Sequence, residues 1–457
     1  MAVDVVIRNC RIVSPEGITA AGIACNSGKI VAISNDANLP ESRKIINAEG
    51  NYVLPGIIDT HVHIGCYHSF EEDIKDTIGA VFGGITTVGN YLGSGEESQK
   101  DSYDLSFDRW RETWEKHSLV DAFFHAMIIS DVNMKEIKLK ARRYGIASSK
   151  FLMAYKGAEA EQIGAAPTDD GLLWYGFKEI ASLGNPALAM VHCENMDIIN
   201  RIRPEVEVTG RQDLAAWEES RPGFCETLDI ERAISISQVT GVPLYIVHVS
   251  NGASVDLIAG FKSRGANVLA ETCPQYLVLD KYTPLGPLGK VNPPLRDEAS
   301  SKRLWQGLRE GTIDCMGTDH CSPTYDQKRD LWGAVPGMPG METFLPIMLS
   351  EGVNKGRITL EKLVEILCKN NAKVFGVYPK KGVIQVGSDA DLVIVDLNKK
   401  AKLTFNKDHG CYDFIPYEGL EVKGCPVLTM LRGTVLVENG KLVDKPGLGK
   451  YIPRFVG

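Results

Sequence analysis

Eight short apolar segments, separated by longer amphipathic stretches, fill the middle of this 457-residue chain. They read GIIDTHVHIG, GGITTVGNYL, VDAFFHAMII, IASSKFLMAY, ALAMVHCEN, PLYIVHVSN, NVLAETCPQY and IDCMGTDHC. Continuous apolar runs are typical of strands buried on both faces of a parallel sheet, and the helix-like stretches between them supply the crossovers. Eight such units predict an α/β fold, a closed (β/α)₈ TIM barrel, over residues 55–376.

The two ends of the chain have a different pattern. DVVIRNCRIV and IACNSGKIVAIS near the N-terminus, and DADLVIVDL near the C-terminus, are typical of strands, and Asn439-Gly440 is a hairpin turn signal. Neither end alone has enough strands for a core of its own. We therefore expect residues 1–54 and 377–457 to form one small β-sandwich domain, with the barrel inserted between its halves.

The composition of the chain excludes some classes of binding partner and of cellular location. The net charge of −8 and the pI near 5.7 argue against nucleic acid or an anionic membrane as a partner. The first residues lack the apolar core of a signal peptide, and no 18-residue apolar window is present. The 11 cysteines are scattered without a CxxC pair, which predicts a cytoplasmic protein with reduced thiols.

Groups able to bind metal fall at or near the C-terminal ends of five of the eight predicted strands. They are His61, His63, Lys150, His192, His248 and Asp319. The C-terminal ends of the strands form the active-site mouth of a barrel of this kind. Any one of these residues alone has an ordinary explanation, such as a hydrogen-bonded core histidine or a turn aspartate. Their joint placement predicts a metal site at one rim of the barrel.

Lys150 leaves two alternatives open. It is either a structural lysine paired with an acid, or a lysine that works in the metal site. Metal ions would repel a buried ammonium and depress its pKa. A neutral amine can react with carbon dioxide to give a carbamate, an anion with two oxygens that can bridge two metals.

The sequence resembles the cyclic amidohydrolases: hydantoinases, dihydropyrimidinases and allantoinases, with dihydroorotases as more distant relatives. The similarity extends over nearly the whole chain. The matching motifs are PGIIDTHVHI, FGGITTV, SSKFLMAYKG, VHCEN, IVHVSN, ETCPQYL, NPPLR and GTDHCSP. The segments DLAAWEESRP and ADLVIVDL are most similar to those of hydantoinases.

The resemblance implies a site with two divalent metal ions, zinc first and manganese, cobalt or iron as alternatives. It assigns His61, His63 and Asp319 to one ion and His192 and His248 to the other. Carboxylated Lys150 bridges the two ions. Asp319 also shuttles the proton, and Tyr155 stabilises the oxyanion.

The resemblance also implies the reaction: hydrolytic opening of a cyclic amide to an N-carbamoyl amino acid. Asn292 and Pro336 occupy the substrate-binding positions. Both depart from the hydantoinase pattern, since Ser is common at the first and Asn at the second. Proline keeps its carbonyl acceptor but has no N–H donor. A homotetramer is expected, in which the apolar C-terminal tail GKYIPRFVG reaches a neighbour.

Two alternative functions remain. One is allantoinase, which differs from a hydantoinase in its substrate and not in its catalytic residues. The other is a non-catalytic scaffold, which would have lost metal ligands that this chain keeps. Dihydroorotases carry HxHxxR, whose arginine binds the substrate carboxylate, and Cys66 stands at that arginine's position. We therefore expect a neutral ring as substrate. The sequence assigns no role to Cys66, Cys193 or Cys321, and it leaves the 5-substituent, its handedness and the metal open.

Overall fold

A computed structural model describes residues 2–92, 103–157, 160 and 168–456. Its largest element is an eight-stranded parallel sheet in which the strands follow one another in chain order. The strands are β8 (Ile57–Val62), β9 (Ile85–Leu92), β10 (Asp121–Ile128), β11 (Ser148–Leu152), β12 (Leu188–His192), β13 (Leu244–Ile246), β14 (Val268–Thr272) and β15 (Cys315–Met316). The sheet closes where the His63 N–H donates to the His320 carbonyl at 2.7 Å. The predicted barrel is confirmed.

The barrel strands are apolar on both faces. Neighbouring residues such as Phe123 and Phe124 on β10 belong to two different core clusters. Phe123 and Tyr245 both contact the Phe375 ring inside the barrel, and Phe124 contacts Trp114 of helix Tyr103–His117 outside it. This double burial explains why the strands read as continuous apolar runs and not as alternating ones.

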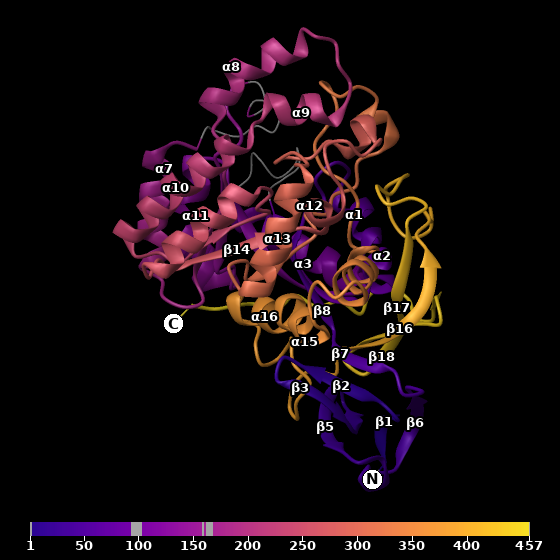
Figure 1. The fold of residues 1–457 in the computed structure, drawn as a ribbon. Coiled ribbons are helices and arrows are strands. Elements are labelled where there is room, and N and C mark those ends of the chain that lie inside the picture. Colours follow the sequence, from indigo (N-terminus) through magenta and orange to yellow (C-terminus); the bar gives the residue numbers. More distant parts are fainter. Residues whose placement is uncertain (1, 93–102, 158–159, 161–167, 457) are drawn as a thin grey trace.

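Helices surround the barrel (Figure 1). They are α1 (Phe70–Asp73), α2 (Thr77–Phe82), α3 (Tyr103–His117), α4 (Asp131–Lys135), α5 (Ile137–Leu139), α7 (Asp170–Ala181), α8 (Met196–Glu207), α9 (Leu214–Ser220), α10 (Gly223–Thr240), α11 (Gly252–Ser263), α12 (Pro274–Val278), α13 (Glu298–Glu310), α14 (Phe344–Ile347), α15 (Leu360–Val364) and α16 (Asn370–Val374). π-helical turns at Lys140–Tyr144, Met348–Asn354 and Glu365–Lys369 continue α5, α14 and α15. Side chains of Asp169, Asn251 and Asp297 cap the N-termini of α7, α11 and α13, as short polar residues commonly do.

The two chain ends meet in a second, smaller domain, drawn in indigo and yellow in Figure 1. One sheet has the order β5-β4-β1-β6 and the other β19-β18-β17-β16-β7-β2-β3. The strands are β1 (Val3–Arg8), β2 (Arg11–Ser14), β3 (Gly17–Ala20), β4 (Gly22–Asn26), β5 (Lys29–Ser34), β6 (Ser42–Asn47), β7 (Tyr52–Pro55), β16 (Leu392–Lys402), β17 (Glu421–Leu431), β18 (Thr434–Glu438) and β19 (Lys441–Leu442). Because β7 pairs with β16, the predicted β-sandwich of both termini is confirmed. Its proposed limits, 1–54 and 377–457, stay predictions.

The C-terminal tail packs on its own barrel. The Ala122 N–H donates to the Lys450 carbonyl at 2.9 Å, and the Ile452 N–H donates to the Ala122 carbonyl at 2.7 Å. Arg454 is buried and donates to the Phe124 carbonyl. The tail thus crosses the barrel at the N-terminal ends of its strands, while Phe455 remains 58% exposed. A contact between this tail and a second subunit stays a prediction.

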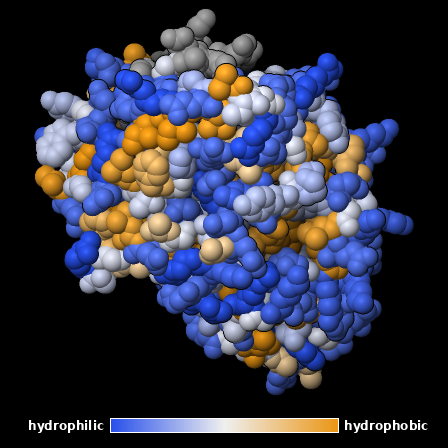
Figure 2. All heavy atoms as spheres, turned by 45° about the horizontal axis from the view of Figure 1, so that its top comes forward, coloured by the Kyte–Doolittle hydropathy of each residue, from blue (hydrophilic) through white to orange (hydrophobic). Residues whose placement is uncertain are grey.

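One face of the molecule is mainly polar (Figure 2). On the face shown in Figure 2, hydrophilic residues dominate and apolar residues gather in separate patches. Among the described helices, none combines the length and the apolar character needed to cross a bilayer.

Candidate metal centre

Three of the predicted ligands meet at the C-terminal mouth of the barrel. His61 lies on β8 and His63 directly follows its end, two residues later and so on the same side, and Asp319 follows β15. The Asp319 carboxylate lies 3.0 Å from His61 Nε2 and 3.3 Å from His63 Nε2. Within the described residues, these three side chains form a group compact enough to hold one metal ion.

A second pair of histidines lies beside the first group. His192 is the last residue of β12, and His248 follows the end of β13. His192 Nδ1 and His248 Nε2 face each other at 3.1 Å. Positive φ angles occur at His248 (+40°) and at Asp319 (+55°), a backbone conformation that costs free energy for residues other than glycine. Such strain is concentrated at functional sites.

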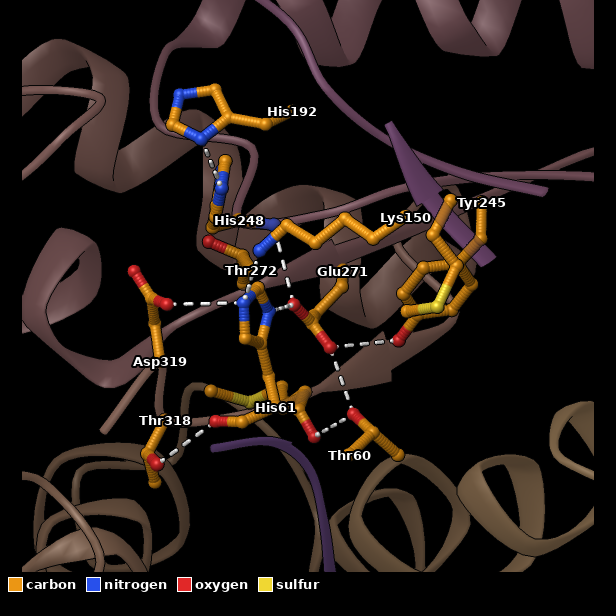
Figure 3. A network of polar contacts seen from close by, with 12 residues as sticks. Thr60, His61, Lys150, His192, Tyr245, His248, Glu271, Thr272, Thr318 and Asp319 are labelled. Atoms are coloured by element: carbon orange, nitrogen blue, oxygen red, sulfur yellow. Dashed lines mark hydrogen bonds and ion pairs between the residues drawn. The ribbon is translucent and has the colours of Figure 1, made fainter. Parts of the chain in front are cut away.

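Lys150 projects from β11 toward both groups (Figure 3). Its Nζ lies 2.8 Å from His61 Nε2 and 3.5 Å from His63 Nε2, and 4.2 Å from the centre of the Tyr91 ring. Burial lowers the pKa of this amine to about 8. In the described part of the chain no carboxylate lies within ion-pair distance of Lys150, so the alternative of a structural lysine paired with an acid loses its partner.

This donor set fits two divalent ions. Imidazole nitrogens and carboxylate oxygens are ligands that zinc prefers. The Nε2 atoms of His63 and His248 face the other site residues. Their Nδ1 atoms are buried and have no hydrogen-bond partner among the described residues. Five side chains and an amine of lowered pKa therefore converge on one small space at the rim where the sequence places them.

Glu271 fixes the orientation of His61. Its carboxylate accepts a hydrogen bond from His61 Nδ1 at 2.6 Å and further bonds from the hydroxyls of Thr60 (2.8 Å) and Tyr245 (2.9 Å) (Figure 3). The proton on Nδ1 leaves the lone pair of Nε2 facing Asp319 and Lys150. The sequence analysis used the ETCPQYL segment, which contains Glu271, only as a motif of the family resemblance and did not predict this contact with a predicted ligand.

Glu194 and Arg221 are also absent from the sequence predictions. Glu194 accepts a hydrogen bond from His192 Nε2 at 2.9 Å and pairs with the Arg221 guanidinium. Burial opposes ionisation of Glu194, but the Arg221 guanidinium lowers its pKa to about 2. The only sequence signal for Glu194 is its place two residues after His192 in VHCEN.

The predicted substrate-binding residues lie in three separate segments. Tyr155 is half-buried, with its ring edge-on to His192 and the ring centres 5.9 Å apart. Asn292 is buried, and its Oδ1 finds no hydrogen-bond partner among the described residues. The Pro336 carbonyl accepts a hydrogen bond from the Tyr67 hydroxyl, and the Gly337 N–H donates to Lys290, which brings the segments of Asn292 and Pro336 together.

Two loops follow residues of the predicted site in the sequence. The loop after Cys66 leads into α1, where Glu71 and Glu72 are exposed. The loop after Tyr155 includes positions 158–159 and 161–167, which lie outside the described residues.

A second group of acids, Asp121, Asp389 and Asp391, also has metal-site dimensions. The amine of Lys381 fills it, at 2.6, 2.9 and 2.5 Å from the three carboxylates. Since Asp121 begins β10, this cluster lies at the end of the barrel opposite the histidines and joins the barrel to the sandwich.

Comparison with known proteins identifies relatives over the whole chain. The model of the "Amidohydrolase family" matches residues 295–436. An L-hydantoinase of Paenarthrobacter aurescens is 38% identical over 99% of this chain and 98% of its own length. A D-hydantoinase of Geobacillus stearothermophilus is 36% identical over 98% of this chain and 96% of its own length.

Solved structures agree with this result. The structure of an L-hydantoinase (dihydropyrimidinase) from Arthrobacter aurescens superimposes with a TM-score of 0.92 at 36% identity, covering 99% of this chain and 100% of that one. A dihydropyrimidinase from Brevibacillus agri superimposes with a TM-score of 0.90 at 32% identity, covering 99% and 98%. Both D- and L-hydantoinases are thus among the relatives.

Proposed function

The chain belongs to the amidohydrolase family, among the hydantoinases and dihydropyrimidinases, and we propose that it is a metal-dependent hydrolase that opens a cyclic amide ring. The substrate is a hydantoin or a dihydropyrimidine, and the product is an N-carbamoyl amino acid. One observation carries the proposal: the group of His61, His63 and Asp319, with the amine of Lys150 beside its two histidines and the pair His192 and His248 next to it. The relatives named as hydantoinases favour this function over allantoinase.

Two divalent ions, with zinc as the first candidate, are proposed as the cofactor. His61, His63 and Asp319 would hold one ion and His192 and His248 the other, with a carbamate on Lys150 shared between them. Bound ions of this kind activate a water molecule and polarise a carbonyl. The lowered pKa of the Lys150 amine, about 8, supports the carbamate, because only the neutral amine reacts with carbon dioxide.

Asp319 and Tyr155 are proposed to carry the proton and the charge. The imidazole of His61 beside it holds the pKa of Asp319 well below its usual range, against the effect of burial, so the group is an ionised acceptor. It takes the proton of the attacking water and returns it to the leaving ring nitrogen. The Tyr155 hydroxyl donates to the oxyanion that forms on the ring carbonyl.

Asn292 and Pro336 are proposed to recognise the ring. The unpartnered Oδ1 of Asn292 is an acceptor for a ring N–H, since a buried polar atom left without a partner costs free energy. The ring is neutral, because Cys66 offers no positive charge to a substrate carboxylate. Assembly into a homotetramer is proposed from the family resemblance.

Metal analysis and a substrate panel test the function. We expect two equivalents of zinc per chain and turnover of hydantoins or dihydrouracil above that of allantoin. Lys150→Ala should lose both bound metal and activity, and added formate or acetate should restore part of each by replacing the carbamate. Lys140→Ala removes another buried lysine, which lies on the π-helical turn Lys140–Tyr144 and not on a barrel strand, and serves as the matched control. Full metal content and turnover in Lys150→Ala would disprove the shared carbamate.

A further inference from the structure

The two histidines of the second pair are supported differently. His248 Nδ1 is buried without a hydrogen-bond partner among the described residues. His192 Nε2 lies 2.9 Å from the Glu194 carboxylate. A carboxylate only accepts, so the proton sits on Nε2 and the lone pair of Nδ1 faces His248. The direction in which His192 presents its free nitrogen therefore depends on Glu194.

The guanidinium of Arg221 holds Glu194 in place with two hydrogen bonds. Arg221 Nε and a terminal nitrogen donate to the two carboxylate oxygens, each at 3.0 Å. The side chains of Glu194 and Arg221 are at most 1% exposed. An isolated buried carboxylate would take up a proton, but this two-pronged pair keeps it ionised and fixes its plane.

Arg296 ties this pair to two other segments of the site. One of its terminal nitrogens donates to the Arg221 carbonyl at 2.6 Å, and its Nε donates to the Ser250 hydroxyl at 3.0 Å. Ser250 lies two residues after His248, and Arg296 lies four residues after Asn292. One buried network therefore reaches His192, the segment after His248 and the segment of the proposed substrate-binding residue.

We propose that Glu194, held by Arg221, whose carbonyl in turn binds Arg296, is the positioning residue of the second metal-binding pair. The proposal rests on the proposed function and deepens it. Glu271 does the corresponding work for His61 through hydroxyl partners on β8 and β13. Because the side chains that contact Glu271 differ from those that contact Glu194, a change at Glu194 should act on the second pair alone.

Metal titration of the apoprotein separates the two pairs. We expect the wild type to bind two zinc ions in two resolvable steps, and His248→Ala to identify the step of the second pair by abolishing it. Glu194→Gln should weaken that step by about 10–100-fold, the usual effect of removing a partner of a ligating histidine, and leave the other step unchanged. Asp229→Asn removes another buried carboxylate, which accepts hydrogen bonds from Asn195 and Arg232 and from no proposed ligand, and both of its steps should match those of the wild type.

The outcomes distinguish this inference from the proposed function. A wild type that binds no zinc would refute the proposed function and the inference with it. Two wild-type steps, with neither or both moved in Glu194→Gln, would refute the inference alone. If Glu194→Gln does not fold by circular dichroism, Arg221→Lys takes its place, because it keeps the charge and loses the two-pronged geometry. An unmoved second step in that variant would equally overturn the inference.

Discussion

Lys381 is expected to be the strongest single determinant of stability at the junction between the barrel and the sandwich. Its amine is 1% exposed and lies within 2.9 Å of Asp121, Asp389 and Asp391. The Lys381→Met variant keeps much of the side-chain volume and leaves three buried carboxylates with less compensating charge. Removing one partner of a buried ion pair typically costs about 3–5 kcal/mol, and the upper end applies here because Lys381 serves three acids.

Thermal unfolding followed by circular dichroism measures this effect. At about 2 °C per kcal/mol for a large chain, the midpoint should fall by roughly 10 °C at pH 7. Lys380→Met is the matched control, because that neighbouring amine lies 4.0 Å from Asp389 and is half exposed. Exposed pairs contribute about 0–1 kcal/mol, so the control should move by no more than about 2 °C.

The pH dependence follows from the direction of the shift. Although burial opposes it, Asp391, Asp121 and Asp389 raise the pKa of Lys381 above its ordinary value of 10.5. Its stabilising contribution is therefore fully present at pH 7 and is lost only as the pH rises past its folded-state pKa. The difference in midpoint between the wild type and Lys381→Met should therefore be the same at pH 7 and pH 8, both below the ordinary pKa of a lysine. Equal midpoints for Lys381→Met and Lys380→Met at pH 7 would refute the argument.

Three further predictions concern catalysis, folding and specificity. Asp319→Asn should lower kcat far more than it changes KM, because a proton carrier acts in the transition state. Tyr155→Phe should lower kcat by about 10²–10³-fold. Steady-state kinetics on hydantoin checks both variants, and a change in KM alone would contradict the proposed roles. Burial lowers the pKa of the Lys328 amine from 10.5 to about 7. Keeping the charged amine buried therefore lowers the stability of the fold below pH 7, and this penalty disappears as the pH rises toward 10.5. The stability of the wild type relative to Lys328→Met should therefore rise between pH 7 and pH 9, in urea unfolding at each pH, and a falling difference would contradict it. Dihydroorotate should have a kcat/KM well below that of hydantoin because Cys66 cannot neutralise its carboxylate, and equal values would overturn the neutral-ring assignment.

The sequence alone determined the architecture and the candidate ligands. Runs that are apolar on both faces exist only where a strand is covered on two sides, so eight of them with helical crossovers leave few folds other than a barrel. Parallel strands in a barrel bring their C-terminal ends to one rim, and this geometric rule alone is enough to place His61, Lys150, His192 and Asp319 near one another. The β pattern at both chain ends likewise required a joint domain, because neither end has a core of its own.

Only the tertiary structure decided which groups support those ligands. Glu271 lies 210 residues from His61, and Arg221 lies 27 residues from Glu194. Their contacts depend on strand register and helix placement. The sequence around a single buried carboxylate does not reveal either. Lys381 was also invisible in the sequence, as one lysine among many in a turn-rich segment, until the fold surrounded it with three acids. A hydrophobic pattern is a local property of the chain and can be read from neighbouring residues. The partner of a buried charge depends on which distant segments the fold brings together.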